Sequence, residues 1–225
     1  MTKLETISAE DLQNRTYEPT HFLVDELIPE GLHILAGAPK IGKSWLALWL
    51  CLCVSQGQSL WGFATAQGEV LYLSLEDSFQ RIQTRLCDLT EDAPPTLHFA
   101  IMADTLKHGL EQQVEQFLTE HPNTKLVVID TLQRVRGTGC DNNLYANDYQ
   151  DIGLLKNFAD KQKLIDQYEL IDYPKYYLSK EFDYLICGIG CSFDTRGDKV
   201  MSHGGITIDE VIVPFIKIKA VENNG

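Results

Sequence analysis

The stretch of sequence that decides the fold reads Gly37-Ala38-Pro39-Lys40-Ile41-Gly42-Lys43-Ser44. It matches the pattern G-x-x-x-x-G-K-[ST] at every fixed position, and loops with this pattern turn their backbone N–H groups inward to bind phosphate. Lys43 has the reach to contact β- and γ-phosphates, and the Ser44 hydroxyl is suited to ligate Mg²⁺. We therefore predict that these eight residues bind a nucleotide, with ATP and Mg²⁺ as the ligands.

The segments on either side of this loop have the composition that the motif requires. Residues 32–36 are apolar and predict a buried strand, and residues 45–54 are apolar enough for a buried helix that ends at Gly57. A strand, a glycine-rich loop and a helix in this order place a helix N-terminus behind the phosphates, where it adds positive charge. This context favours a true phosphate-binding loop over a turn that matches by chance.

Strands and helices alternate beyond the loop. Apolar runs predict strands at 69–75, 97–101 and 125–131, and helical spacing of apolar residues predicts helices at 78–89 and 110–119. An alternation of this kind predicts an α/β fold with a mainly parallel sheet.

Two acidic residues follow predicted strands. Asp130 comes directly after a fully apolar run, which is the Walker B pattern, and predicts an acid that holds Mg²⁺ opposite Ser44. Glu76 follows the strand at 69–75, and ligands of open α/β sheets bind beyond the carboxyl ends of the strands. Glu76 is therefore predicted to orient and partly deprotonate the attacking water. The alternative is that Glu76 or Asp77 caps the following helix, a role we favour for Asp77.

The bulk composition limits the classes of function. The chain has 225 residues and a formal net charge of −13, which argues against a free-standing nucleic-acid binder but leaves room for a local basic patch or for DNA held inside an oligomer. The longest apolar run, residues 45–54, is too short to cross a bilayer, so no membrane partner is expected. The six cysteines show no C-x-x-C spacing, which argues against zinc and favours buried thiols in a reducing cytoplasm.

Residues 25–164 resemble a known family. Stretches 31–45, 70–78, 126–133 and 142–149 are similar to those of RecA-like P-loop ATPases of the RepA type, the AAA_25 group, which is related to hexameric replicative helicases. The resemblance implies a three-layer α/β/α domain in which Lys43 and Ser44 hold phosphate and Mg²⁺, Glu76 is the catalytic glutamate and Asp130 is the Walker B acid. It also implies a homo-oligomeric, hexameric ring that acts on nucleic acid such as single-stranded DNA, often in mobile elements.

Arg134 and Arg136 follow the Walker B strand. They are candidates to face DNA in a central channel or the γ-phosphate of a neighbouring subunit. The alternative is that both are solvated loop arginines, and one sequence does not fix the direction of the loop.

The family pattern stops after residue 164. It calls for another buried strand that ends in a polar sensor, whereas residues 165–174 are polar, rich in tyrosine and broken by proline. We therefore expect a RecA-like core at 26–164 that is truncated, preceded by a lead-in at 1–25, with turnover weakened by the missing sensor strand. A second possibility is that residues 184–189 and 211–216 supply the missing strands, with Ser192 or Asp194 as sensor.

The tail has a resemblance of its own. Residues 182–219 are similar to the C-terminal end of PglZ-type proteins of the alkaline phosphatase superfamily, in which the histidine matching His203 is a metal ligand. The tail at 165–225 is therefore expected to be a small α+β segment. One histidine cannot hold a catalytic metal, so we expect no phosphatase activity, and Asp194 and Asp198 are more simply loop residues than part of a site.

Three functions remain open at this point. The first is an ATPase of DNA replication or of mobile elements. The second is a regulatory or scaffold protein that binds nucleotide with little turnover, which the negative charge favours. The third is a metal-dependent phosphohydrolase carried by the tail.

Overall fold

The computed structural model describes part of the chain in full atomic detail. Backbone and side chains are described for residues 4, 6–17, 19–136 and 150–162, and the backbone alone for 144–149, 163–168, 170–172, 185–187 and 211–216. The helices are α1 (Ala9–Asn14), α2 (Lys43–Gln56), α3 (Phe79–Leu89), α4 (Leu110–Glu120), α5 (Leu132–Val135) and α6 (Leu144–Tyr168). The strands are β1 (Phe22–Val24), β2 (Ile28–Pro29), β3 (Gly31–Leu32), β4 (Leu35–Ala36), β5 (Glu69–Ser74), β6 (Leu97–Ala100), β7 (Thr124–Asp130), β8 (Leu170–Asp172), β9 (Leu185–Cys187) and β10 (Val211–Ile216).

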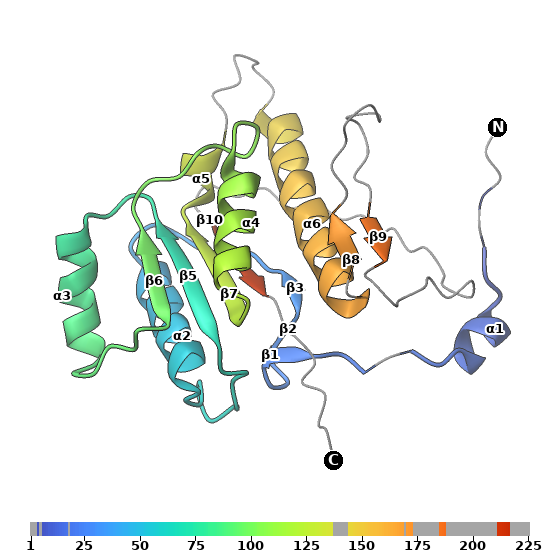
Figure 1. Ribbon diagram of the computed structural model, residues 1–225, viewed down its shortest axis with the longest axis horizontal. Coiled ribbons are helices and arrows are strands. Elements are labelled where there is room, and N and C mark those ends of the chain that lie inside the picture. The colour runs from blue at the N-terminus through green and yellow to red at the C-terminus, as the bar shows by residue number, and fades with distance from the viewer. Residues whose placement is uncertain are drawn as a thin grey trace.

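A six-stranded sheet forms the centre of the described structure (Figure 1). Its order is β3-β10-β7-β5-β6, and β4 also pairs with β10. Strand β5 runs parallel to both β6 and β7, as the alternation of strands and helices predicted. The loops that leave β5 and β7 at their carboxyl ends therefore start from the same edge of the sheet.

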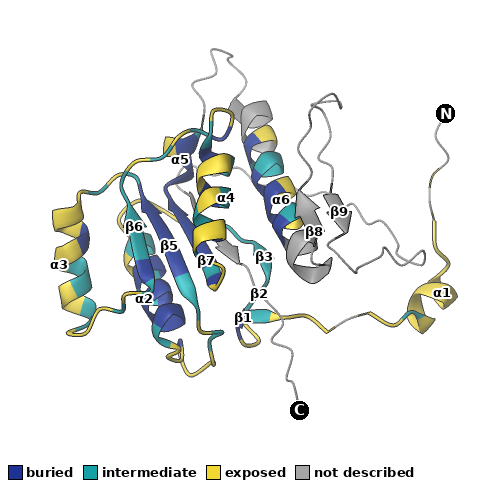
Figure 2. Cartoon of the chain, viewed as in Figure 1, coloured by how far each residue is buried: buried dark blue, intermediate teal, exposed yellow. Residues whose placement is uncertain are grey.

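Helices cover both faces of the sheet because its central strands are apolar on both sides (Figure 2). Alternate residues of β5 and β7 point to opposite faces, as strand geometry requires. Val70, Tyr72, Leu126 and Val128 lie in the core on the α2 side, and Leu71, Leu73, Val127 and Ile129 lie in the core with α4 and α6. The three-layer α/β/α arrangement expected for a RecA-like P-loop fold is confirmed.

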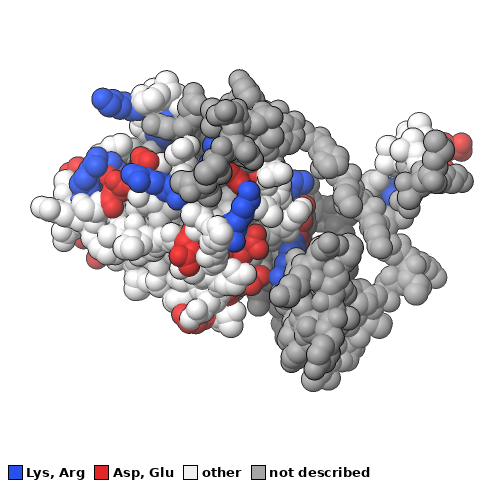
Figure 3. All heavy atoms as spheres, turned by 90° about the horizontal axis from the view of Figure 1, so that it is seen from above, with Lys and Arg blue, Asp and Glu red and all other residues white. Residues whose placement is uncertain are grey.

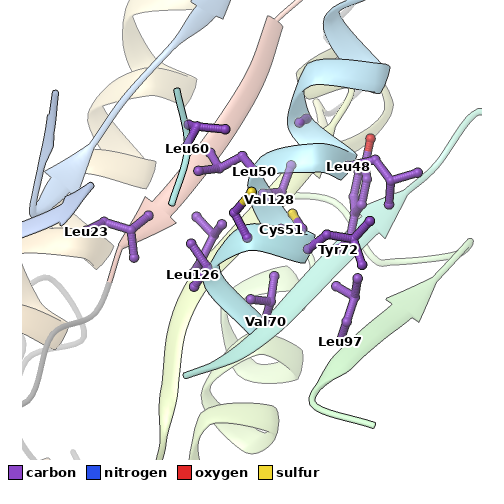
Figure 4. Packing of buried hydrophobic residues seen from close by; sticks show 14 of the residues in the cluster. Leu23, Leu48, Leu50, Cys51, Leu60, Val70, Tyr72, Leu97, Leu126 and Val128 are labelled. Atoms are coloured by element: carbon purple, nitrogen blue, oxygen red, sulfur yellow. The ribbon is translucent and has the colours of Figure 1, made fainter. Parts of the chain in front are cut away.

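Helix α2 lies in the core because it is apolar around its whole circumference. Its residues Leu48, Leu50 and Cys51 meet the side chains of the sheet in Figure 4. The helix ends at Gly57, whose φ of 67° permits a left-handed cap in which its N–H donates to the carbonyls of Cys53 and Val54. The N-terminal segment adds to the same core, since Leu23 and Val24 are fully buried there.

Strand β10 lies between β7, which ends at Asp130, and the strands β3 and β4, which precede the glycine-rich loop. It pairs antiparallel with β7 on one side and antiparallel with β3 and β4 on the other. The possibility that residues 211–216 replace a missing core strand is confirmed, but the strand runs against its neighbours. Apolar composition places such a run in a sheet without setting its direction, because parallel and antiparallel pairing satisfy the same backbone groups.

The other proposed replacement strand does not join this sheet. Residues 185–187 form β9, which pairs antiparallel with β8 in a separate two-stranded sheet. The prediction that residues 184–189 complete the central sheet is therefore wrong. The proposed sensor residues Ser192 and Asp194 lie outside the described residues.

Candidate functional site: a phosphate-binding loop at the sheet edge

The glycine-rich loop connects β4 to α2, as the sequence predicted. Its first five residues are exposed, and α2 begins at Lys43 with Gly42 as its N-cap. Gly42 has a φ of 98°, a backbone conformation that residues with a β-carbon rarely adopt. The second glycine of the motif is thus required by the turn that points the N-terminus of α2 at the loop.

The Lys43 side chain contacts the backbone of its own loop. Its ammonium donates hydrogen bonds to the carbonyl oxygens of Gly37, at 2.7 Å, and Ala38, at 2.9 Å. Both acceptors belong to the loop that the motif assigns to phosphate. The cation is therefore held at the mouth of the loop, within reach of an anion that enters it.

Asp130 ends β7 at the level of this loop. The backbone register pairs Ile212 of β10 with Leu35 on one side and with Asp130 on the other. Because β10 is antiparallel to both neighbours, β4 and β7 run in the same direction, and their carboxyl ends lie at one edge of the sheet. The loop after β4 and Asp130 thus lie at the same edge of the sheet.

Tyr72 links the acid to the first turn of α2. Its hydroxyl donates to Asp130 Oδ2 at 2.7 Å and lies 3.4 Å from the carbonyl oxygen of Ser44. Tyr72 is 2% exposed and Asp130 is 9% exposed, so the pair lies in the interior. The hydrogen bond fixes one carboxylate oxygen of Asp130 beside the segment that carries the Ser44 hydroxyl.

Glu76 lies two residues beyond the end of β5, at the same sheet edge. The N–H of Leu75 donates to the carbonyl oxygen of Asp130 at 2.7 Å, which ties the end of β5 to the end of β7. The Glu76 side chain is half exposed, and its Oε1 lies 3.3 Å from Arg134 Nε. Glu76 is therefore a carboxylate at the sheet edge that carries the loop, and its side chain forms a solvent-exposed ion pair with Arg134.

The neighbouring acid has a different environment. Ser78 caps α3 by accepting a hydrogen bond from the N–H of Arg81, so the prediction that Glu76 or Asp77 is the cap is wrong. The Asp77 side chain is 8% exposed and pairs with Arg81 and Arg85. Asp77 thus pairs with two arginines of the helix that follows it, and Glu76 is the acid of the two that faces solvent.

Comparison with known families agrees with this geometry. The family AAA_25, described as an AAA domain, matches residues 2–164. The chain belongs to this AAA-domain family. The match includes the whole loop, Glu76 and Asp130, and it makes the chain a P-loop nucleotide-binding domain. No curated protein and no solved structure matches the chain significantly.

The two arginines after the Walker B strand of the AAA domain lie in different settings. Arg134, on the short helix α5, is 59% exposed beside Glu76. Arg136 is 15% exposed, and its Nε donates to Asp151 of α6 at 3.1 Å. The guanidinium of Arg136 is thus held inside the AAA domain, which leaves Arg134 as the better candidate for an external phosphate or nucleic acid.

The tail residues singled out from the sequence are not part of the described site. His203, Asp194 and Asp198 lie outside the described residues, so the proposed metal ligand stays a prediction. Among the described residues of the AAA domain, no helix has the length and apolar character needed to cross a membrane.

Tyr72 is the site residue that sequence reasoning missed. It lies in the middle of the apolar strand Glu69–Ser74, where an aromatic residue is expected on packing grounds alone. A buried phenol nevertheless needs a hydrogen-bond partner, and the acid at the end of a neighbouring strand is a natural one. The need of a buried phenol for a hydrogen-bond partner therefore predicts a bond between Tyr72 and an acid such as Asp130.

We expect Tyr72→Phe to lower the free energy of unfolding of the AAA domain by about 1–3 kcal/mol, because it leaves a buried carboxylate oxygen without its donor. Urea unfolding at neutral pH measures the change. Tyr17→Phe is the matched control, since Tyr17 is 61% exposed and its substitution should cost less than about 0.5 kcal/mol. Equal stability of Tyr72→Phe and the native protein would show that the hydrogen bond contributes nothing.

The same tyrosine gives the AAA domain a pH dependence at alkaline pH. Burial, and then the negative charge of Asp130 and the hydrogen bond to it, raise the pKa of Tyr72 far above its ordinary value of 10.0. Above pH 10 the unfolded chain releases a phenol proton that the folded chain retains, so the free energy of unfolding falls as pH rises. Burial also raises the pKa of Cys51 above its ordinary value of 9.0, with the same sign of effect from about pH 9.

Urea unfolding at pH 10 and pH 11 tests this dependence. Between pH 10 and pH 11 the free energy of unfolding of the native protein should fall by about 1 kcal/mol more than that of Tyr72→Phe. A proton that only the unfolded chain releases lowers this free energy by up to about 1.4 kcal/mol per pH unit, and Tyr72→Phe lacks that proton. Equal losses in both proteins would mean that Tyr72 ionises in the folded state.

Proposed function

We propose that the chain binds ATP with Mg²⁺ at residues 37–44 and hydrolyses it, as a RecA-like ATPase of the RepA helicase type in DNA replication or mobile elements. The observation that carries the proposal is the placement of Asp130, through Tyr72, against the first turn of α2, where Ser44 lies. A hydroxyl and a carboxylate are oxygen ligands of the kind that Mg²⁺ prefers. The donor set therefore fits the ion.

The phosphates would bind to the backbone N–H groups of the loop and the N-terminus of α2, which attract anions. Lys43 would then exchange the carbonyl oxygens of Gly37 and Ala38 for phosphate oxygens, which are stronger acceptors because they are charged. Mg²⁺, when bound by Ser44 and Asp130, neutralises charge on the phosphates.

Glu76 would orient the attacking water in line with the γ-phosphate. Its ion pair with Arg134 is exposed on both sides, and such pairs contribute at most about 1 kcal/mol. Arg134 can therefore leave Glu76 at little cost. An arginine so released is available to a phosphate, either of the same nucleotide or of a neighbouring subunit.

A role on nucleic acid rests on the family resemblance and on Arg134. Figure 3, which looks down on the end of the molecule that carries α5, shows Lys and Arg side chains lying next to Asp and Glu side chains. Such a mixed surface does not favour tight DNA binding by one subunit. We therefore propose that single-stranded DNA is bound by a ring, where arginines such as Arg134 from several subunits face a common channel.

Phosphate release with and without single-stranded DNA, beside sedimentation of the protein with ATP, tests this function. The proposal predicts a ring-sized oligomer in ATP and faster turnover with DNA. ATP binding by a monomer whose turnover DNA does not change would reject the motor function. It would instead support the regulatory or scaffold protein that the net charge of −13 favours.

A further inference from the structure

We propose that Glu69, His98 and His121 form a zinc site at the edge of the sheet opposite the phosphate-binding loop. The three side chains offer one carboxylate oxygen and two imidazole nitrogens, all within 4.8 Å of one another. Two histidines and one acid, with a remaining position for water, are a ligand set that Zn²⁺ uses. None of these residues belongs to the nucleotide site.

The fold brings the three residues together from separate segments. Glu69 is the first residue of β5, His98 lies in β6, and His121 is the C-cap of α4. Glu69 and Asp130 lie at opposite ends of the parallel pair of β5 and β7, because Glu69 is level with Thr124 at the start of β7. The cluster is therefore at the amino edge of the sheet, and the loop is at the carboxyl edge.

The atoms already face one another at near-ligand spacing. Oε2 of Glu69 lies 3.2 Å from His98 Nε2 and 2.6 Å from His121 Nδ1. In a tetrahedral zinc site with bonds of about 2.0–2.1 Å, ligand atoms lie about 3.3 Å apart. The Glu69–His98 distance thus already matches this spacing, and His121 needs to retreat from the carboxylate by about 0.7 Å. The two imidazole nitrogens lie within 4.8 Å of each other and need to reach the same spacing when the ion binds.

The surroundings hold both rings in place. Phe117 of α4 stacks on His121 with ring centroids 4.3 Å apart and meets His98 edge-on at 5.3 Å. The turn after His121 is closed by Thr124, whose N–H and hydroxyl both bond to the His121 carbonyl oxygen. The site is therefore preorganised by packing, which lowers the cost of binding an ion.

The three side chains of the cluster are partly buried. The side chains of His98, His121 and Glu69 are 30%, 29% and 20% exposed. An ion can thus enter from solvent and keep a water ligand, while three protein ligands bind β5, β6 and the segment between α4 and β7 together. Zinc at this position would stabilise the folded chain.

Calorimetric titration of the purified full chain with Zn²⁺, in excess Mg²⁺ to occupy the nucleotide site, tests the proposal. We expect one saturable site, and a rise in melting temperature of about 5–10 °C when free Zn²⁺ is 100-fold above its dissociation constant. Absence of saturable binding in the native protein would overturn the proposal.

Variants identify the ligands. Glu69→Gln, His98→Gln and His121→Gln should each weaken Zn²⁺ binding by more than about 100-fold, since even the loss of groups that only orient a ligand costs 10- to 100-fold. His108→Gln is the matched control, because His108 is exposed and lies outside the cluster. Circular dichroism without metal shows which variants are folded, and any one folded variant of the three is sufficient for the test.

Thiols are the competing ligands, and Cys87 is exposed. Titration with Co²⁺ separates the two cases, since thiolate ligation gives intense charge-transfer absorption and nitrogen and oxygen ligation does not. We expect weak visible bands alone, unchanged in Cys87→Ser. Zn²⁺ binding that survives in all three cluster variants would place the ion elsewhere and refute the site. Intense charge-transfer bands that grow as Co²⁺ binds would do the same.

Discussion

Replacing Lys43 with alanine is expected to weaken ATP binding by about 100- to 1000-fold. The ammonium is held at the mouth of the loop by the carbonyl oxygens of Gly37 and Ala38, from which it can turn to the phosphates. A hydrogen bond to a charged group contributes about 1.5–3 kcal/mol, and the loss of two such bonds at the lower end of this range, about 3–4 kcal/mol, gives a change of this size. Titration with a fluorescent, non-hydrolysable ATP analogue and Mg²⁺ measures it.

Lys156→Ala is the matched control for this variant. Lys156 lies on α6, is 47% exposed and pairs with Asp160 one helical turn later. Its removal changes the net charge by the same amount without touching the loop, so ATP affinity should stay close to that of the native protein. Equal weakening in both variants would mean that Lys43 acts through overall charge only, and an unchanged affinity in Lys43→Ala would place the nucleotide elsewhere.

Glu76→Gln should separate binding from turnover. We expect phosphate release to fall by about 100- to 10,000-fold, the usual contribution of a general base, while ATP affinity stays near the native value. The reason is positional, since Glu76 follows β5 and contacts Arg134, and its side chain is not part of the loop that holds the phosphates. Single-turnover hydrolysis with enzyme in excess gives the rate of the chemical step.

Glu91→Gln provides the control for the change of a carboxylate to an amide, because Glu91 is exposed in the connection between α3 and β6. It should hydrolyse ATP at the native rate. Retention of native turnover in Glu76→Gln would remove Glu76 from the mechanism. Loss of ATP binding in Glu76→Gln would instead assign it to holding the nucleotide.

The parts of the site that sequence predicted are those whose chemistry depends on neighbours along the chain. The loop at 37–44 and the strands ending before Glu76 and at Asp130 each carry their own local signal, and the parallel order of β7 and β5 follows from the alternation of strands and helices. The helix predicted at 78–89 begins one residue later in the structure, and Ser78, not Asp77, is its N-cap.

What sequence did not reveal depends on residues that are distant along the chain. The direction of β10 was open because its apolar run has no local feature that orients it. The bond between Tyr72 and Asp130 spans 58 residues. The cluster of Glu69 with His98 and His121 joins three segments, so its ligands show no metal-binding spacing, and the cysteine pattern that argued against zinc does not concern it.

Phosphate release from ATP by the native protein, with Mg²⁺ and with the ion removed by EDTA, tests the central claim most directly. The account predicts turnover in Mg²⁺ that stops in EDTA and is absent from Lys43→Ala, because we propose that Ser44 and Asp130 hold the ion and that Lys43 binds the phosphates. Turnover that continues in EDTA, or that Lys43→Ala retains at the native rate, would contradict it. So would a native protein that binds no ATP under either condition.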